Sequence, residues 1–163
     1  MRKEGKNRIR QILQIKKILY TTDLSENSAY AFYYAADMAK KNEAKIVILH
    51  VIEPLTTFLM ASEAFVEEIR ERIQKLRQRV DRIIGTSSDE FVSKVLIRIG
   101  RPSEEILRTI DEEGCDVIII GSHGKESLTQ SFFGNVSSSI LHRAHKLVFI
   151  VPLPSKKNTT SLI

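Results

Sequence analysis

The chain of 163 residues has 25 Lys or Arg against 20 Asp or Glu, a formal net charge of +5, and one cysteine. At this length one domain can bury a core without disulfides or metal ions. A single cysteine excludes an intramolecular disulfide, and no zinc-type Cys/His pattern is present, which fits a reducing cytoplasm. No run reaches the roughly 18 apolar residues of a membrane span, so we expect a cytoplasmic protein with no membrane partner.

The positive charge lies at the two ends of the chain. Residues 1–17 carry seven Lys or Arg and one Glu, and residues 152–163 carry two Lys and no acid, so the ends sum to +8 and the rest to −3. Proteins that bind nucleic acid usually gather charge on one folded face among aromatic side chains. We therefore expect no nucleic-acid partner, and a domain of residues 16–152 between a basic tail, 1–15, and a disordered tail, 153–163.

Strand and helix patterns alternate along the domain. In chain order the sequence predicts a strand over 17–20, a helix capped by Ser25, a strand over 45–51, an amphipathic helix over 65–84, a strand over 92–99, a helix from an N-cap at Ser103 to about Glu113, a strand over 116–120, a helix over 135–144 and a strand over 147–151. The strand over 45–51 contains a continuous apolar run, which is typical of central parallel strands, and the strand over 116–120 has the clearest pattern of a buried strand. The sequence therefore predicts an α/β fold with a single doubly wound, five-stranded parallel sheet.

Polar and glycine residues directly follow the first and the fourth predicted strand. In open parallel sheets, ligands bind beyond the carboxyl ends of the strands. Thr22-Asp23 and Gly121-Ser122-His123-Gly124 stand there, and Gly134-Asn135 then opens a helix whose N-terminal amides attract phosphate. Glycines at both ends of the four-residue turn allow positive φ and close approach of a ligand. Two ordinary turns are the alternative reading of the glycines alone.

The glycine pattern matches neither of two common phosphate motifs. It is not a Walker loop, because Lys125 is followed by Glu126. It is not a Rossmann fingerprint either, because the glycines follow the fourth strand and not the first.

Four sequence features together resemble the universal stress proteins over roughly residues 15–152. They are Lys17-Ile18-Leu19-Tyr20 with Asp23 and Ser25, His50-Val51, Gly100-Arg101-Pro102, and Gly121-Ser122-His123-Gly124 with nine residues before Gly134. The resemblance implies a Rossmann-like, adenine nucleotide alpha hydrolase-like fold with the strand order 3-2-1-4-5. It also implies ATP as the ligand, with Mg²⁺ or Mn²⁺ on its phosphates, and a nucleotide-dependent regulatory or stress-response role.

The same resemblance implies where the nucleotide lies. The three motif glycines would wrap the phosphates and ribose, Asp23 would lie by the nucleoside, and Val51 would offer backbone groups to adenine. The expected nucleotide-binding residues are Thr21, Thr22, Asp23, Val51, Ile120, Gly121, Ser122, His123, Gly124, Gly134, Asn135, Val136, Ser137 and Ser138. The hydroxyls of Ser137 and Ser138 would donate to phosphate oxygens. His123 is expected to make a contact and not to act as an acid or base.

Three residues depart from the family pattern. Thr21 and Leu147 stand where the family often has proline, and Asn135 replaces the usual Ser or Thr after the third glycine. Asn keeps two N–H donors and is a good N-cap, so we expect phosphate binding to survive. The alternative is a member of the family that binds no nucleotide.

Other titratable residues give weaker signals. His142 and His145 lie three apart but have no carboxylate or thiolate partner nearby in sequence, so we expect no metal site there. His50 closes a buried strand and is expected to be structural, and Cys115 opens one and is expected to be inert. No catalytic residue is recognisable, and Asp23 is the one acid that could hold Mg²⁺.

The favoured function is nucleotide binding with at most slow ATP hydrolysis. Two alternatives stay open: a nucleotide-free dimeric interaction module, and an adenylating or phosphoryl-transfer enzyme of the same fold group. The last strand, Leu147–Val151, is apolar throughout and lies at the sheet edge in the family strand order. An exposed edge needs a partner, so we expect a homodimer formed through this strand. The sequence does not identify a protein partner.

Overall fold

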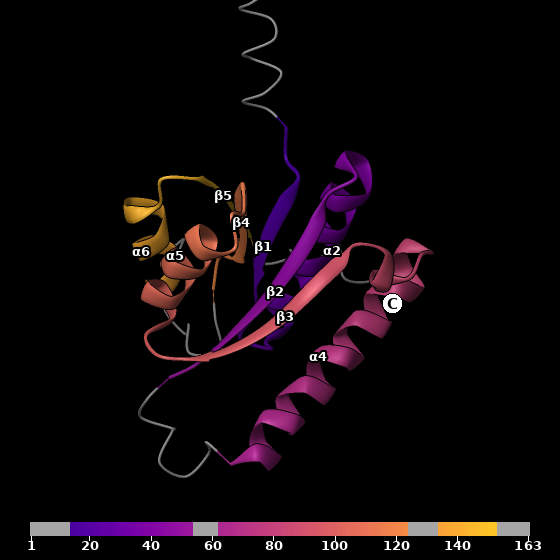
Figure 1. Ribbon diagram of the computed structural model, residues 1–163, viewed down its shortest axis with the longest axis horizontal. Coiled ribbons are helices and arrows are strands. Elements are labelled where there is room, and N and C mark those ends of the chain that lie inside the picture. Colours follow the sequence, from indigo (N-terminus) through magenta and orange to yellow (C-terminus); the bar gives the residue numbers. More distant parts are fainter. Residues whose placement is uncertain (1–13, 54–61, 124–133, 153–163) are drawn as a thin grey trace, which may run out of the picture.

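One parallel sheet with helices on both faces makes up the computed structural model, which describes residues 14–53, 62–123 and 134–152 (Figure 1). In chain order its elements are β1 (Lys17–Thr21), α2 (Glu26–Asn42), β2 (Lys45–Ile52), α4 (Glu63–Ile84), the 3-10 turn η2 (Ser88–Glu90), β3 (Val92–Ile99), α5 (Pro102–Glu112), β4 (Val117–Gly121), α6 (Asn135–Arg143) and β5 (Leu147–Val151). The strands pair in the order β3-β2-β1-β4-β5, and every pairing is parallel. The predicted fold class and strand order are confirmed.

Strands β1 and β4 form the centre of the sheet. Residues 18–20 of β1 and 117–119 of β4 have no exposed surface. Because helices cover both faces, the central residues of these strands are buried and largely apolar, which explains the continuous runs in the sequence. Ile18 pairs with Ile46 of β2 on one side and with Val117 of β4 on the other. The carboxyl end of β1 therefore lies between the carboxyl ends of its two neighbours.

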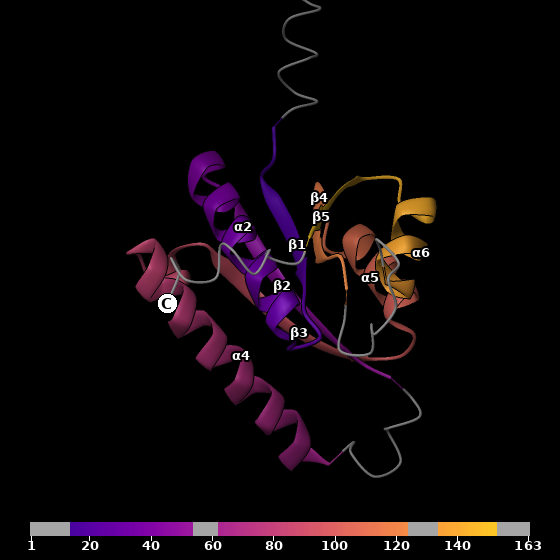
Figure 2. The same cartoon turned by 180° about the vertical axis from the view of Figure 1, so that it is seen from behind.

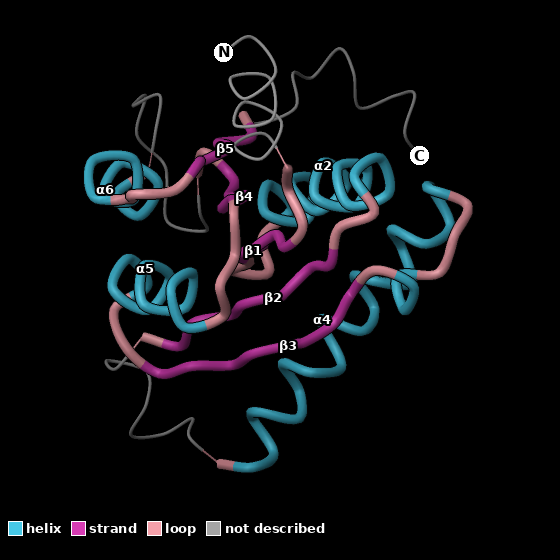
Figure 3. Tube along the Cα trace, turned by 45° about the horizontal axis from the view of Figure 1, so that its top comes forward, coloured by secondary structure: helices cyan, strands magenta, loops and turns pink. Residues whose placement is uncertain are grey.

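Helices α2 and α4 cover one face of the sheet, and α5 and α6 cover the other (Figures 1 and 3). Successive strand residues point to opposite faces, so Ile18 and Tyr20 join the core under α2 and α4, while Leu19 joins the core under α5 and α6. The Tyr20 ring stacks on Phe32 of α2 with 4.7 Å between ring centroids. The view from behind shows α2 over the centre of the sheet and the longer α4 on the β3 side (Figure 2).

The first residues of the helices show which of the N-caps predicted from the sequence are present in the structure. Ser25 caps α2 as predicted, and Ser62 caps α4. The predicted N-cap of α5, Ser103, is wrong, because the helix begins at Pro102 with Arg101 as its N-cap residue. Proline suits the first helical position because its φ is already near the helical value and an N–H there would have no partner within the helix.

The described residues contain the whole sheet but not every predicted segment. Most of the two predicted tails and the predicted site residue Gly124 lie outside them. No helix in this part of the chain is long and apolar enough to span a membrane.

Candidate functional site

The predicted site residues that the structure describes gather at the carboxyl end of the sheet. Thr21 ends β1, Val51 lies near the end of β2, and Gly121 ends β4. These strands are parallel neighbours, so their carboxyl ends lie side by side, where ligands of such sheets bind. Gly134, the N-cap residue of α6, donates its N–H to Ser122 O at 2.7 Å. This bond brings the start of α6 to the end of β4.

Short-range hydrogen bonds hold the loop between β1 and α2. Thr22 Oγ1 accepts a hydrogen bond from Leu24 N at 3.0 Å. Asp23 Oδ1 accepts one from Ser25 N, also at 3.0 Å. Leu24 has a φ of 64°, which is uncommon for a residue with a side chain. These bonds fix the loop and place the partly exposed Asp23 at the carboxyl end of the sheet.

His50 joins the end of β2 to the same loop. Its Nδ1 lies 2.7 Å from Thr22 O, and the residue is 9% exposed. A carbonyl oxygen accepts hydrogen bonds and cannot donate, so Nδ1 carries the proton. Thr22 N donates in turn to Leu49 O of β2 at 2.9 Å. This arrangement agrees with the structural role that the sequence indicates for His50.

Asn27 of α2 holds the turn after β4. Its Nδ2 donates to His123 O at 2.6 Å. A Cβ on Gly121 would lie 2.9 Å from the same nitrogen, which is too close for any side chain unless Asn27 moves. Gly121 has no positive φ. The sequence argument that this glycine supplies positive φ is therefore wrong, and the close approach of Asn27 is the reason for glycine here.

Asn27 lies beside the proposed site at the carboxyl end of the sheet, although it is not among the residues predicted from the sequence. Its residue is 5% exposed, and its Oδ1 is buried with no hydrogen-bond partner in the described part of the chain. The signal that could have found it is its place in the first turn of the helix after β1. A polar side chain there lies at the same end of the sheet as the glycine turn.

The turn itself is tied to its neighbours through Ser122. Ser122 N donates to Val151 O of β5 at 2.7 Å, and Ser122 Oγ lies 2.9 Å from His123 Nδ1. Ser122 and Ile120 are buried, whereas His123 is partly exposed. The His123 ring is thus oriented by the hydroxyl of the preceding residue.

The start of α6 differs from the starts of α2 and α4. Gly134 has no side chain, so the N-cap residue itself makes no side-chain bond to the N–H groups of the first turn. Those N–H groups and the helix dipole give this end of the helix a partial positive charge. Asn135, the first residue of the helix, is exposed, and Val136 is partly buried. The arrangement can hold an anion such as a phosphate group.

Ser137 uses its hydroxyl within the protein. Its Oγ lies 2.9 Å from Ser122 O and 3.0 Å from Gly134 O, and both oxygens are acceptors. The residue is 2% exposed. In this structure Ser137 therefore fixes the start of α6 with its hydroxyl. Ser138, whose N–H donates to Gly134 O at 3.0 Å, is partly buried.

The structure bears on two expectations from the sequence, that His142 and His145 form no metal site and that Cys115 is inert. Across the described ranges, no group of three or more His, Cys, Asp or Glu residues is placed to hold a metal ion. His142 and His145 are both exposed, at and just after the end of α6. Cys115 has no exposed surface, and burial raises the pKa of its thiol to about 11. Little reactive thiolate forms near neutral pH at this position.

Comparison with known proteins identifies the family. The model of the Universal stress protein family matches residues 14–152. The chain belongs to this family. Universal stress protein MJ0577 of Methanocaldococcus jannaschii is 29% identical over 152 residues, which cover 83% of this chain and 94% of that protein. A solved structure of MJ0577 has a TM-score of 0.65 and 28% identity, and the match covers 88% of this chain and 99% of that one.

Two more distant structures of the family contain nucleotides. A universal stress protein in complex with cAMP has a TM-score of 0.61 and 19% identity, and the match covers 85% of this chain and 98% of that one. A universal stress protein from Archaeoglobus fulgidus in complex with dAMP has a TM-score of 0.60 and 18% identity, with 84% and 97% covered. At these identities the likeness shows the shared fold.

Proposed function

We propose that this universal stress protein binds an adenine nucleotide, ATP in particular, at the carboxyl end of its sheet. The observation that carries the proposal is the bond from Gly134 N to Ser122 O, which sets the uncapped first turn of α6 beside the turn after β4. The fold neighbours that hold cAMP and dAMP support an adenine nucleotide as the ligand class.

In this proposal the phosphates lie on the first turn of α6. The N–H groups of Asn135, Val136 and Ser137 are the donors that a helix N-terminus leaves without partners in the helix. The exposed Asn135 adds a side-chain amide, which has two further N–H donors. Gly124 would complete the phosphate-binding turn, and it lies outside the described residues.

The nucleoside lies between the loop after β1 and the end of β2 in the same proposal. The partly exposed Asp23 accepts hydrogen bonds from the ribose hydroxyls, and the backbone of Val51 reaches the adenine ring. Thr21 and Ile120, which are 6% and 7% exposed, form the apolar and backbone floor below the sugar. The fixed loop conformation around Asp23 means that little order has to be gained on binding.

A divalent cation, Mg²⁺ or Mn²⁺, would bind mainly through the phosphates and water. Asp23 is the one carboxylate among the proposed site residues, and one carboxylate with phosphate oxygens suits Mg²⁺. The His123 ring is engaged with Ser122 Oγ, so the site offers contacts more than acid–base groups. We therefore assign the protein a nucleotide-dependent regulatory role, with at most slow ATP hydrolysis.

Calorimetric titration with ATP and Mg²⁺ tests the proposal. The variant Gly134→Val should bind ATP at least about tenfold more weakly, because a branched side chain crowds the anion. Valine accommodates the φ of −72° and ψ of 168° at this position, so the fold should be kept. Leu141→Val, at an exposed position further along α6, is the matched control. Equal affinity of the two folded variants would contradict a phosphate site at α6.

The second part of the proposal is a homodimer through β5. This strand pairs with β4 and ends the sheet, and its Leu147 and Phe149 side chains are 52% and 47% exposed. Pairing with a second β5 would satisfy the outer edge and cover these side chains. Light scattering should give twice the mass of the 18.6 kDa chain. Phe149→Lys or Val148→Pro should shift it toward monomer, and a clean monomer of the unmodified chain at tens of micromolar would overturn the dimer.

A further inference from the structure

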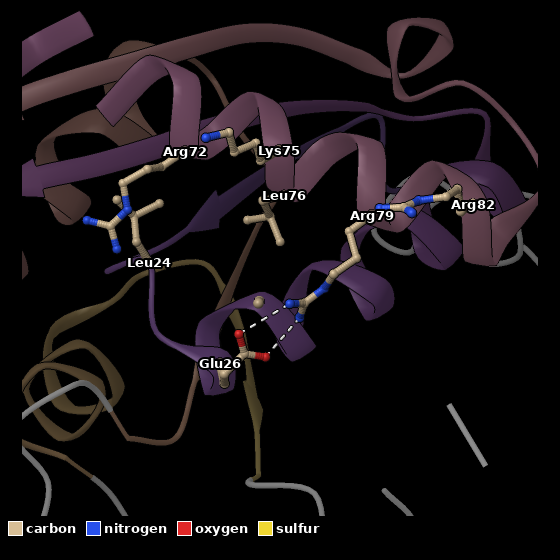
Figure 4. Close-up of a pocket in the computed structure, with 8 residues that line it drawn as sticks. Leu24, Glu26, Arg72, Lys75, Leu76, Arg79 and Arg82 are labelled. Carbon is tan, nitrogen blue, oxygen red and sulfur yellow. Dashed lines mark hydrogen bonds and ion pairs between the residues drawn. The ribbon is translucent and has the colours of Figure 1, made fainter. Parts of the chain in front are cut away.

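A groove lies between the start of α2 and the middle of α4 (Figure 4). Its volume is about 380 Å³. The residues that line it are Leu24, Glu26, Ala29, Arg72, Lys75, Leu76, Arg79 and Arg82. Apart from Leu24, which belongs to the loop after β1, the lining comes from two helices and includes none of the proposed nucleotide-binding residues.

Four cations of α4 form a stripe along this groove, which we call the basic stripe: Arg72, Lys75, Arg79 and Arg82. They are separated by three, four and three positions, so they share one face of the helix. At a rise of 1.5 Å per residue the stripe is about 15 Å long. Glu26 is the one acid among the lining residues, so the groove carries an excess of positive charge.

One member of the basic stripe is paired within the protein. Arg79 Nη1 and Nη2 lie 3.2 and 3.0 Å from the two carboxylate oxygens of Glu26, and Arg79 Nε donates to Tyr33 OH at 3.2 Å. This bidentate pair joins α4 to the start of α2. Arg79 therefore has a structural role in shaping the groove.

The remaining members of the basic stripe are available to a ligand. Arg72 and Lys75 are exposed, and neither makes a hydrogen bond or ion pair with another described residue. Arg82 Nε donates to Gln78 O of its own helix at 3.4 Å, and its two Nη atoms make no hydrogen bond or ion pair with another described residue. By contrast, Arg77 on a different face of α4 is paired with Asp89.

Apolar side chains lie between the cations. Leu76 is 9% and Ala29 5% exposed, and Leu24 is partly exposed. Figure 4 shows Leu76 between Arg72 and Arg79, with Leu24 beside Arg72. A ligand that fits such a groove has an apolar side chain flanked by carboxylates. That combination is typical of an amphipathic acidic peptide segment.

We propose that this groove docks an acidic, amphipathic peptide segment of a partner protein, with apolar side chains on Leu76 and carboxylates on Arg72 and Lys75. None of the eight lining residues is aromatic, and the cations lie on a single helix, so stacking and a long phosphate track for nucleic acid are absent from this groove. This proposal does not rest on the proposed nucleotide binding.

Fluorescence anisotropy with a labelled synthetic peptide tests the groove. The peptide has leucine at every fourth position and glutamate between the leucines. The double variant Arg72→Glu with Lys75→Glu should weaken its binding about tenfold or more, because like charges then face each other. The matched control, Arg70→Glu with Lys40→Glu, changes the net charge equally at exposed positions outside the groove and should stay within about twofold.

Further measurements distinguish the proposed acidic peptide from other ligands of the groove. Replacing the leucines of the peptide by serine, or its glutamates by glutamine, should each lower affinity, because both chemistries are needed. Circular dichroism checks that all variants are folded. The proposal would be overturned if both double variants lost affinity equally, or if the acidic peptide did not bind at all. It would also be overturned if a single-stranded oligonucleotide bound more tightly than the peptide, with the same dependence on Arg72 and Lys75.

Discussion

The two ends of the parallel sheet satisfy their polar groups in different ways, and the amino end does so with charges. Glu113 accepts from Lys94 Nζ at 2.9 Å and from Lys17 Nζ at 3.3 Å. Asp116 Oδ2 accepts from the backbone N–H groups of Lys16 and Lys17 at 2.8 and 2.9 Å. The carboxylates of Glu113 and Asp116 at this end therefore have their donors inside the protein.

The carboxyl ends of β1, β2 and β4 are held mostly by bonds between uncharged groups. Thr22 O is bonded to His50, and Ser122 O accepts from Gly134 N. These bonds position turns, but the N-cap residue of α6, Gly134, provides no side-chain cap for the first turn of the helix. In our proposal, one end of the sheet is completed by its own side chains, and the other presents groups for a ligand. Substitutions at the amino end should change stability without changing affinity, whereas substitutions at the carboxyl end should change affinity, with or without a change in stability.

The largest effect is expected for Gly121→Val at the carboxyl end. The new side chain must displace Asn27, whose Nδ2 would lie 2.9 Å from the Cβ, and the turn loses its bond to His123 O. We expect a loss of about 1 to 3 kcal/mol of stability from overpacking and at least tenfold weaker ATP binding, measured by denaturation and calorimetry.

Gly85→Ala is the control for this change. A Cβ there meets nothing within 4 Å, although its φ of 67° costs about 1 kcal/mol. Wild-type affinity for ATP in both glycine variants would show that the turn after β4 is not part of the site.

A smaller effect on ATP affinity is expected for substitutions of Asn135. They separate the contribution of its side-chain donors from that of the backbone donors of α6. Asn135→Ala should weaken ATP binding by about 1.5 to 3 kcal/mol, the value of a hydrogen bond to a charged group. Asn135→Ser should keep the affinity, because a hydroxyl also donates. If the alanine variant binds as tightly as the wild type in calorimetry, the backbone amides of α6 carry the anion alone.

At the amino end, Asp116→Ala should affect stability and not binding. The variant removes the acceptor for two backbone N–H groups, so we expect a loss of about 1 to 2 kcal/mol in urea unfolding. ATP affinity should remain that of the wild type. A large loss of affinity with normal stability would reverse the assignment of the two ends.

The smallest effect is a pH dependence from Glu113. The hydrogen bond from Lys94, and then that from Lys17, holds the pKa of its carboxyl below the ordinary value. A lowered pKa in the folded state adds stability above the unfolded pKa, and this stability is lost as the pH falls from about 5 to 3. The Tm difference between the wild type and Glu113→Gln should therefore shrink over this range.

Glu67→Gln, on the exposed surface of α4, is the control for the pH series. A Tm difference for Glu113→Gln that stays constant from pH 7 to pH 3 would contradict the ion pairs at the amino end.

The strands β1, β2 and β4 could be predicted from the sequence because burial on both faces leaves apolar runs. The strand order came from the family resemblance, since the runs themselves do not say which neighbours pair. The start of α5 was misplaced because Ser103 is a good N-cap, and Pro102 took precedence. The place of Asn27 in the first turn of α2 was a signal for the site, but its contact with His123 could not be predicted, because it joins residues 96 positions apart. Long-range contacts of this kind depend on the fold and leave no local pattern.

Backbone amide NMR during a titration with ATP and Mg²⁺ tests the central claim most directly. The account predicts that the largest shifts occur at the carboxyl end of the sheet, in residues 22–24, 51, 121–123 and 134–138. The lysines at the amino end, Lys16, Lys45 and Lys94, line a surface that could attract ATP by charge alone, so they are the internal comparison. No shifts at saturating ATP, or shifts concentrated at these lysines, would contradict a nucleotide site at the carboxyl end.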